Sequence, residues 1–353
     1  MRKRLITSSL FATLATLTAV SHAQIGSITV YGVLDTSIEH SSNANADKQG
    51  IIRLHSGAVN GSRIGFRGTE DLGGGLTAFF QLENGFRSND GRLVQAEHLF
   101  NRRSLVGLEG RFGRIEVGRT YTTVDNFIAA FEPAGYSWLG TGAAMDKRKD
   151  GMWFHSPNLV KYEVKFGNVK LGASHGLGEV AGSYGSDAKS ALGIGYDKGP
   201  FGIAATIDRV NGISVDNGAY DKATSINLAG GYQISGPLKL TLGYRHYKKR
   251  LASGAADFRS HFYWGGLAYQ ATPTVLLTAS VFAQDVRNMA QGEAGDPIMV
   301  ALNAKYALSK RTILYVSSAY ARTRNNNLVS VSPYQDGFSS SQTRVAGGMQ
   351  HWF

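Results

Sequence analysis

The chain of 353 residues contains no cysteine, and this excludes disulfide frameworks, thiolate metal sites and thiol catalysis. Charged residues are also scarce, at 18% of the chain against about 25% in an average soluble protein. No run after residue 23 reaches the roughly 18 apolar residues that a spanning helix needs, so a helical membrane protein is excluded. Glycine, by contrast, is abundant, with 44 residues, and together with the low charge it sets the chain apart from an average soluble protein.

The first residues have the features of a secretory signal peptide. Basic residues at positions 2–4 precede an apolar, Thr- and Ser-rich stretch from Leu5 to Val20, and Ser21-His22-Ala23 follows. We expect cleavage after Ala23 (signal peptide 1–23), which leaves residues 24–353 as one exported domain. Cleavage lowers the 37 basic residues by three to 34, and against 26 acidic residues the net charge is +8. An exported protein has little access to nucleic acid, so anionic solutes and lipid head groups are the expected partners.

Apolar and polar residues alternate through most of the exported chain. Every second residue is apolar in segments 76–82, 160–166, 238–244 and 298–306. This period of two predicts strands, and amphipathic helices are hard to find. Strands of this kind span the bacterial outer membrane as a β-barrel with an apolar outer face.

Turn signals give the number of strands. Seven tight turns are predicted near residues 71–75, 110–113, 167–168, 198–200, 235–237, 271–273 and 309–311. Eight long polar connections are predicted at 39–60, 87–97, 122–157, 177–189, 209–223, 248–258, 284–296 and 323–341. Their alternation predicts an all-β fold, a sixteen-stranded antiparallel transmembrane β-barrel with an aqueous lumen. A soluble all-β sandwich is the alternative, but it would not need eight pairs of long and short ends.

The third long connection, residues 122–157, is unusual in length and in aromatic content. It includes Phe127, Phe131, Tyr136 and Trp138. Loops of this length are usually functional or disordered, and the aromatic residues argue against disorder. We therefore expect this loop to fold inward onto the barrel wall and to narrow the pore.

Several motifs resemble those of a known family. They are SITVYGVLD at 27–35, GSRIGFRGTEDLGGGL at 61–76, RRSLVGL at 102–108 and the terminal Phe353. With them the chain resembles the general, non-specific porins of Gram-negative outer membranes, most closely the beta-proteobacterial branch. The resemblance implies a homotrimer of barrels in the cell outer membrane, among lipid and lipopolysaccharide, that passes small hydrophilic solutes. It also implies that Phe353 is a signal read by the barrel-assembly machinery.

The resemblance further implies basic residues at a pore constriction. Alternation with Ile64 and Phe66 independently places Arg63 and Arg67 in the lumen. Arg102 matches the family's second basic position, while Arg103 has the opposite parity and is expected at an interface or a strand end. The third basic position holds His155 in place of the usual arginine, and Lys147 is a candidate to replace the missing charge.

Acidic groups on the third loop are the expected counterparts of these cations. Asp125 and Glu132 are the best candidates for this role. Because basic candidates outnumber acidic ones and the exported chain is basic, the sequence favours a preference for anions. No cofactor and no metal site is expected.

Other functions receive less support. The run 172–176 formally matches G-x-S-x-G, but a nucleophile elbow needs a strand-to-helix turn, and here a strand enters a long loop. No H-E-x-x-H motif occurs. A porin specific for one anion, or a barrel that serves mainly as an adhesin or phage receptor, remains an alternative to a general diffusion pore.

Overall fold

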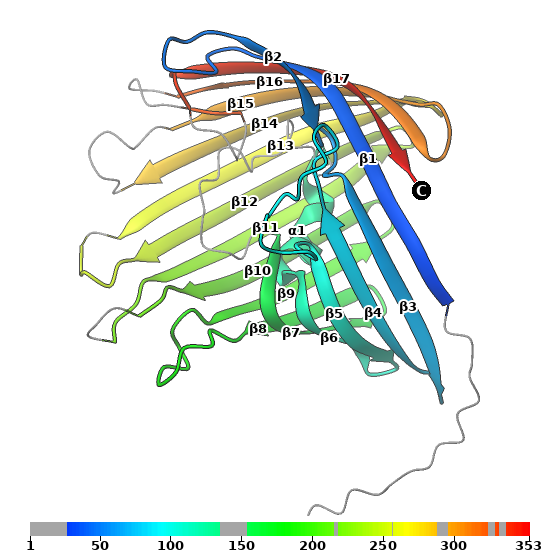
Figure 1. Cartoon of the computed structure of the whole chain (residues 1–353), viewed down its shortest axis with the longest axis vertical. Coiled ribbons are helices and arrows are strands. Elements are labelled where there is room, and N and C mark those ends of the chain that lie inside the picture. The colour runs from blue at the N-terminus through cyan, green and yellow to red at the C-terminus, as the bar shows by residue number, and fades with distance from the viewer. Residues whose placement is uncertain are drawn as a thin grey trace, which may run out of the picture.

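The computed structural model describes residues 27–134, 154–214, 218–255, 257–287, 296–323, 329–331 and 337–353 (Figure 1). These residues are mostly strand, with one short helix, α1 (Thr123–Ile128), and one 3-10 turn, η1 (Ala129–Phe131). Among the described residues, no helix is both long enough and apolar enough to cross a membrane.

The strands follow one another around the sheet in chain order, and every hydrogen-bonded pair of strands is antiparallel. They are β1 (Ser27–Ser41), β2 (Ile51–Ser56), β3 (Arg63–Gly73), β4 (Leu76–Gly85), β5 (Arg103–Gly110), β6 (Gly113–Tyr121), β7 (His155–Phe166), β8 (Val169–Gly176), β9 (Lys189–Lys198), β10 (Phe201–Asn211), β11 (Lys222–Ser235), β12 (Leu238–Arg250), β13 (Phe258–Thr272), β14 (Val275–Arg287), β15 (Ile298–Ala307), β16 (Thr312–Arg322) and β17 (Ser341–Trp352).

The first and last strands close the sheet into a barrel. One edge of β1 pairs with β17, and its other edge pairs with β3 in its first half and with β2 in its second half. Because β2 and β3 lie end to end along the same edge, they are two parts of one barrel strand. The 17 labelled segments therefore make a closed barrel of sixteen strands, and the predicted fold class is confirmed.

The break between β2 and β3 differs from the predicted connection 39–60. Residues 51–56 form strand β2, so the chain returns to the sheet before residue 60. Asp35 of β1 explains the break, since its carboxylate accepts the backbone N–H groups of Val59 (3.3 Å) and Asn60 (2.8 Å). These two N–H groups donate to a side chain and not to the backbone of a neighbouring strand, so the strand is interrupted.

The tight turns lie where the sequence predicts them. Between β3 and β4 the backbone passes through Gly73, Gly74 and Gly75 with φ values of 84°, 60° and 78°. Only glycine adopts such angles without a steric penalty, so three consecutive glycines fix this reversal. The long connections leave from the other end of the barrel, which confirms the predicted alternation of short and long ends.

The outer face of the barrel is apolar. Leu242 of β12 is 56% exposed and Val281 of β14 is 50% exposed, whereas residues of the opposite parity, such as Thr241 (5%) and Phe282 (0%), are buried. A soluble sandwich would bury the alternating apolar residues in a core. Exposed apolar residues on successive strands instead form the continuous band that faces lipid in a membrane barrel.

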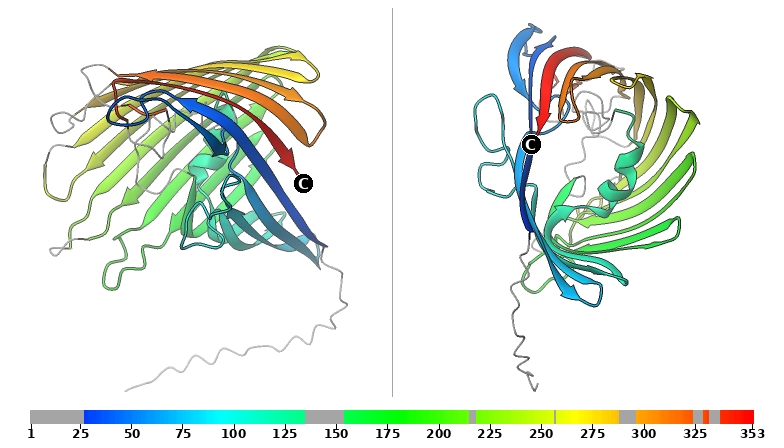
Figure 2. Two further views of the ribbon diagram at one scale, coloured as in Figure 1. Left: turned by 45° about the horizontal axis from the view of Figure 1, so that its top comes forward. Right: turned by 90° about the vertical axis from the view of Figure 1, so that its right-hand side faces the viewer.

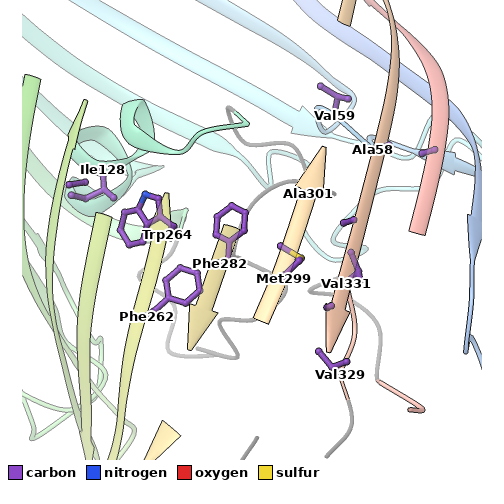
Figure 3. Close-up of a cluster of buried hydrophobic side chains, with 14 of the residues drawn as sticks. Ala58, Val59, Ile128, Phe262, Trp264, Phe282, Met299, Ala301, Val329 and Val331 are labelled. Carbon is purple, nitrogen blue, oxygen red and sulfur yellow. The ribbon is translucent and has the colours of Figure 1, made fainter. Parts of the chain in front are cut away.

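Part of the inner wall is apolar as well (Figure 3). Phe262 and Trp264 of β13, Phe282 of β14 and Met299 of β15 are all buried, and the rings of Phe262 and Phe282 stack with centroids 6.2 Å apart. The indole Nε1 of Trp264 donates a hydrogen bond to the carbonyl oxygen of Phe131 (3.0 Å). This part of the wall thus binds the beginning of the third loop.

Helix α1 opens the third loop and packs on the same side of the barrel. The hydroxyl of Thr122 caps the helix by accepting the N–H of Asp125 (3.2 Å). Phe127 lies over Gly172 of β8 and Gly193 of β9, where an added Cβ would come within 2.6 and 2.9 Å of its ring. In the right-hand view of Figure 2, α1 lies within the ring of strands. Residues 135–153 lie outside the described residues, so the narrowing of the pore by the whole loop stays a prediction.

Candidate functional site

The carboxylate of Glu83 on β4 is the centre of a group of charged side chains on the inner wall. Glu83 is only 4% exposed. Its carboxylate accepts hydrogen bonds from Nε of Arg102 (2.6 Å) and from the hydroxyl of Tyr31 (2.9 Å), and Nε of Arg63 lies 3.8 Å away. Strand register explains the gathering, since Glu83 lies opposite Gly65 of β3 and Arg103 of β5. Arg63 and Arg102, predicted separately, therefore share one carboxylate.

Aromatic rings hold the guanidinium groups around this carboxylate. Arg102 donates from Nη2 to the hydroxyl of Tyr121 (2.6 Å), and the guanidinium carbon of Arg103 lies 4.3 Å from the centroid of the Tyr121 ring. Arg67 lies 5.5 Å from the centroid of the Tyr31 ring. Such cation–π contacts hold a cation without neutralising it. We call Arg63, Arg67, Arg102 and Arg103, with Glu83, the basic cluster; four guanidinium groups and one carboxylate give it a net charge of +3.

Arg103 and Glu83 are the members that the sequence prediction did not place in the site. Arg103 is the first residue of β5, so the expected strand end is right, but its side chain also joins the cluster and donates to Gln81 (2.5 Å). The alternation in β5 could have placed Arg103 on the inner face. The apolar residues Val106 and Leu108 have the opposite parity and are exposed on the outer face. Their parity places residue 103 on the inner face.

His155 lies next to the basic cluster. Its ring centroid is 4.3 Å from that of Tyr121, which also contacts Arg102 and Arg103. Its Nε2 is buried, and no hydrogen-bond partner for it is found within the described part of the chain. An imidazole has an ordinary pKa of about 6.5, so this position does not carry the permanent charge of an arginine.

The predicted acidic counterparts lie at the beginning of the third loop. Asp125 is a buried residue of α1, and Glu132 is buried directly after η1. The ion pairs found for Arg63 and Arg102 lead to Glu83, so the described acidic partner comes from the wall and not from the loop. The role of Asp125 and Glu132 at a constriction stays a prediction. Lys147 lies outside the described residues.

A second ion pair adjoins the basic cluster. Glu116 of β6 lies 2.9 Å from Nζ of Lys161 on β7 and also accepts hydrogen bonds from Thr120 (2.7 Å) and Nε of Arg114 (2.8 Å). Lys161 donates in turn to the carbonyl oxygen of Tyr121 (3.1 Å). The sequence prediction missed this pair. Through Lys161, the pair connects β6 and β7 to Tyr121, the residue that contacts Arg102 and Arg103.

The terminal Phe353 follows β17 at the closure of the barrel. Its backbone N–H donates to the carbonyl oxygen of Gly32 (3.2 Å), and its carbonyl oxygen accepts the N–H of Gly32 (3.1 Å). The residue is 44% exposed. The end of the chain is therefore anchored to β1, and its use as an assembly signal stays a prediction.

Replacing Glu83 by glutamine is expected to strengthen any anion preference. The amide keeps the shape of the carboxylate but raises the net charge of the basic cluster from +3 to +4. Because the guanidinium groups lose their common carboxylate, we also expect Tm to fall by a few degrees. Reversal potentials in a salt gradient and thermal unfolding of purified protein test both effects. An unchanged reversal potential would mean that Glu83 lies away from the ion path.

Comparisons with known proteins identify relatives of this chain. The chain is 27% identical to an outer membrane porin protein of Bordetella pertussis, and the match covers 100% of both chains. It is 28% identical to outer membrane porin protein 32 of Delftia acidovorans, again over 100% of both chains. The solved structure of the anion-selective porin from Comamonas acidovorans matches with a TM-score of 0.82 and 24% identity, and covers 93% of this chain and 100% of that one. This last likeness shows the barrel fold.

A family model matches most of the sequence. The model described as Gram-negative porin matches residues 9–328. The matched range includes the basic cluster, α1 and most of the strands. The chain therefore belongs to the family of Gram-negative porins.

Proposed function

We propose that the basic cluster gives this outer-membrane channel a preference for anions. As a Gram-negative porin, the chain is a barrel in the outer membrane through which small hydrophilic solutes diffuse. The observation that supports a preference is the net charge of +3 on one stretch of the inner wall, from four arginines around Glu83. A structurally similar barrel, the one from Comamonas acidovorans, is described as an anion-selective porin.

Electrostatics in a narrow pore makes such a cluster effective. At an effective dielectric constant of about 20, one charge about 6 Å from an ion contributes on the order of 3 kcal/mol. A difference of about 1.4 kcal/mol already changes an equilibrium tenfold. Glu83 offsets one positive charge and the remainder faces the lumen, so the cluster lowers the free energy of an anion and raises that of a cation.

The third loop completes the proposed constriction. Helix α1 packs against β8 to β11, several strands around the ring from β3, β4 and β5. Asp125 and Glu132 belong to this part of the loop. Opposite charges on separate parts of the wall would create a transverse field that orders water and favours polar solutes over apolar ones.

We also propose that the chain is a channel only, without enzymatic activity. The G-x-S-x-G run at 172–176 lies on β8, in regular pairing with β7 and β9. Ser174 accepts a hydrogen bond from the hydroxyl of Thr123 (2.8 Å), while the ring of His175 contacts Ser190 (2.9 Å). Since alternate residues of a strand point to opposite faces, His175 is not placed to activate Ser174.

The proposed assembly is a homotrimer, exported with a cleaved signal at residues 1–23 and inserted through recognition of Phe353 by the barrel-assembly machinery. Insertion of the purified protein into planar bilayers tests this. We expect conductance to rise in steps of three, and reversal potentials in a potassium chloride gradient to show anion preference. A barrel that inserts without carrying current contradicts the channel. Current with cation preference leaves the channel intact and contradicts the role of the basic cluster.

A further inference from the structure

Two histidines lie side by side on the outer face of the barrel. They belong to β12 and β13, which are neighbours in the barrel wall (Figure 1). His246 and His261 are directly opposite each other in register, and their ring centroids are 4.9 Å apart. They share the parity of Leu242 and Tyr263, which are exposed on the same strands. The two rings therefore point away from the lumen, and they are separate from the basic cluster on the inner wall.

A tyrosine fixes the orientation of one of the two imidazoles. Nδ1 of His261 lies 2.8 Å from the hydroxyl oxygen of Tyr244, and the two rings stack at an interplanar angle of 22°. With the proton on Nδ1 and donated to that oxygen, the lone pair of His261 is on Nε2. Metal-binding histidines typically have their second nitrogen held in this way, because the hydrogen bond fixes both the tautomer and the plane of the ring.

The imidazole of His246 is also available to a ligand. In the described part of the chain, no hydrogen bond or ion pair is found for its ring nitrogens, and its ring contacts that of His261. Its neighbour on the other side, Ile226 of β11, is apolar and 47% exposed. An apolar neighbour does not compete for the nitrogen lone pair. Each ring of the pair can therefore offer one nitrogen to the same ion.

The charges around the pair decide which class of ion it would take. Beside the pair lie the cations Lys248, Arg259 and Arg287, which form ion pairs with the carboxylates of Asp257 and Asp285. Three cations against two carboxylates leave a formal charge of +1. A divalent ion is therefore not attracted by its surroundings and has to be held by bonds to nitrogen. Transition metals form such bonds, whereas Ca²⁺ and Mg²⁺ require oxygen ligands.

We propose that His246 and His261 together bind a divalent transition-metal ion on the outer surface of the barrel. Imidazole is a ligand of Ni²⁺, Cu²⁺ and Zn²⁺, and among these ions Cu²⁺ binds most tightly. Among the described residues, no group of three His, Asp or Glu side chains suited to a metal is found, so water takes the remaining coordination positions. Spacing along the sequence does not reveal the site, because only strand register brings the two rings together. The inference does not depend on anion preference in the pore.

Titration of purified, untagged protein in detergent with Cu²⁺, followed by electron paramagnetic resonance, tests the proposal. For wild type we expect splitting of the signal by the nitrogens of two imidazoles. The variants His246→Gln and His261→Gln each keep one imidazole and should bind Cu²⁺ at least about tenfold more weakly. The control variant His98→Gln removes an exposed histidine between β4 and β5 and should bind like wild type. Equal affinity in all four proteins, or a loss in only one of the two paired variants, would overturn the proposal.

Thermal unfolding provides a second measurement. Without metal, both paired variants should unfold at the temperature of wild type, which shows that the barrel is intact. An ion held between β12 and β13 favours the folded barrel, so Cu²⁺ should raise the Tm of wild type and of His98→Gln, but not that of the paired variants. Ca²⁺ at the same concentration should leave Tm unchanged. If Ca²⁺ stabilises wild type as much as Cu²⁺ does, carboxylates and not imidazoles hold the ion, and the proposal is wrong.

Discussion

Replacing Arg63 and Arg102 together by serine is expected to shift the reversal potential in a salt gradient strongly towards cations. The double variant lowers the net charge of the basic cluster from +3 to +1, and it leaves the buried carboxylate of Glu83 without the two guanidinium groups that approach it. Each lost charge is worth on the order of 3 kcal/mol at about 6 Å before screening by salt. A fall in the anion-to-cation permeability ratio of roughly tenfold or more should follow.

A triple variant separates the effect of charge from the effect of a disturbed site. Adding Glu83→Gln to the double variant removes the stranded carboxylate and restores the net charge of the cluster to +2. Anion preference should therefore fall in the order Glu83→Gln, wild type, triple variant, double variant. Because the order follows charge and not the number of substitutions, general damage to the barrel cannot produce it. If the measured reversal potentials do not follow this order, the basic cluster does not lie on the ion path.

The strands and turns of this barrel could be predicted because they are encoded locally. Alternation along each strand and the glycines at positions 73–75 specify faces and reversals without reference to distant residues. The break between β2 and β3 could not be predicted in this way. It depends on Asp35, whose carboxylate binds the backbone of Val59 and Asn60 from a neighbouring strand.

The site shows the same division between local and distant information. Alternation puts Arg63 and Glu83 on inner faces, but only the register of β3, β4 and β5 shows that they meet. The family resemblance pointed to acidic partners on the third loop, Asp125 and Glu132, and their role stays a prediction. The carboxylate of Glu83, near the end of the alternating strand β4, was not marked out by any motif. Long-range register is therefore the information that the sequence patterns lacked.

Deleting residues 131–141 is expected to raise single-channel conductance on the order of twofold, because conductance follows the open cross-section at the narrowest level. The deletion begins at Phe131, whose carbonyl oxygen accepts the indole N–H of Trp264 (3.0 Å) and whose ring lies over Gly202 and Gly231. The deletion removes this attachment together with the following residues, up to 141, of the loop that is expected to fold inward. Larger neutral sugars should then pass.

Two controls make this result specific to the third loop. Deletion of residues 180–184 shortens the connection between β8 and β9, where Tyr184 is fully exposed, and should leave both conductance and sugar permeation unchanged. Neutral sugars report pore size independently of the charge that is lost with Glu132. If the deletion of residues 131–141 conducts like wild type and excludes the same sugars, the loop does not narrow the pore. In that case the basic cluster alone, on the wall of an open barrel, would have to provide any selectivity.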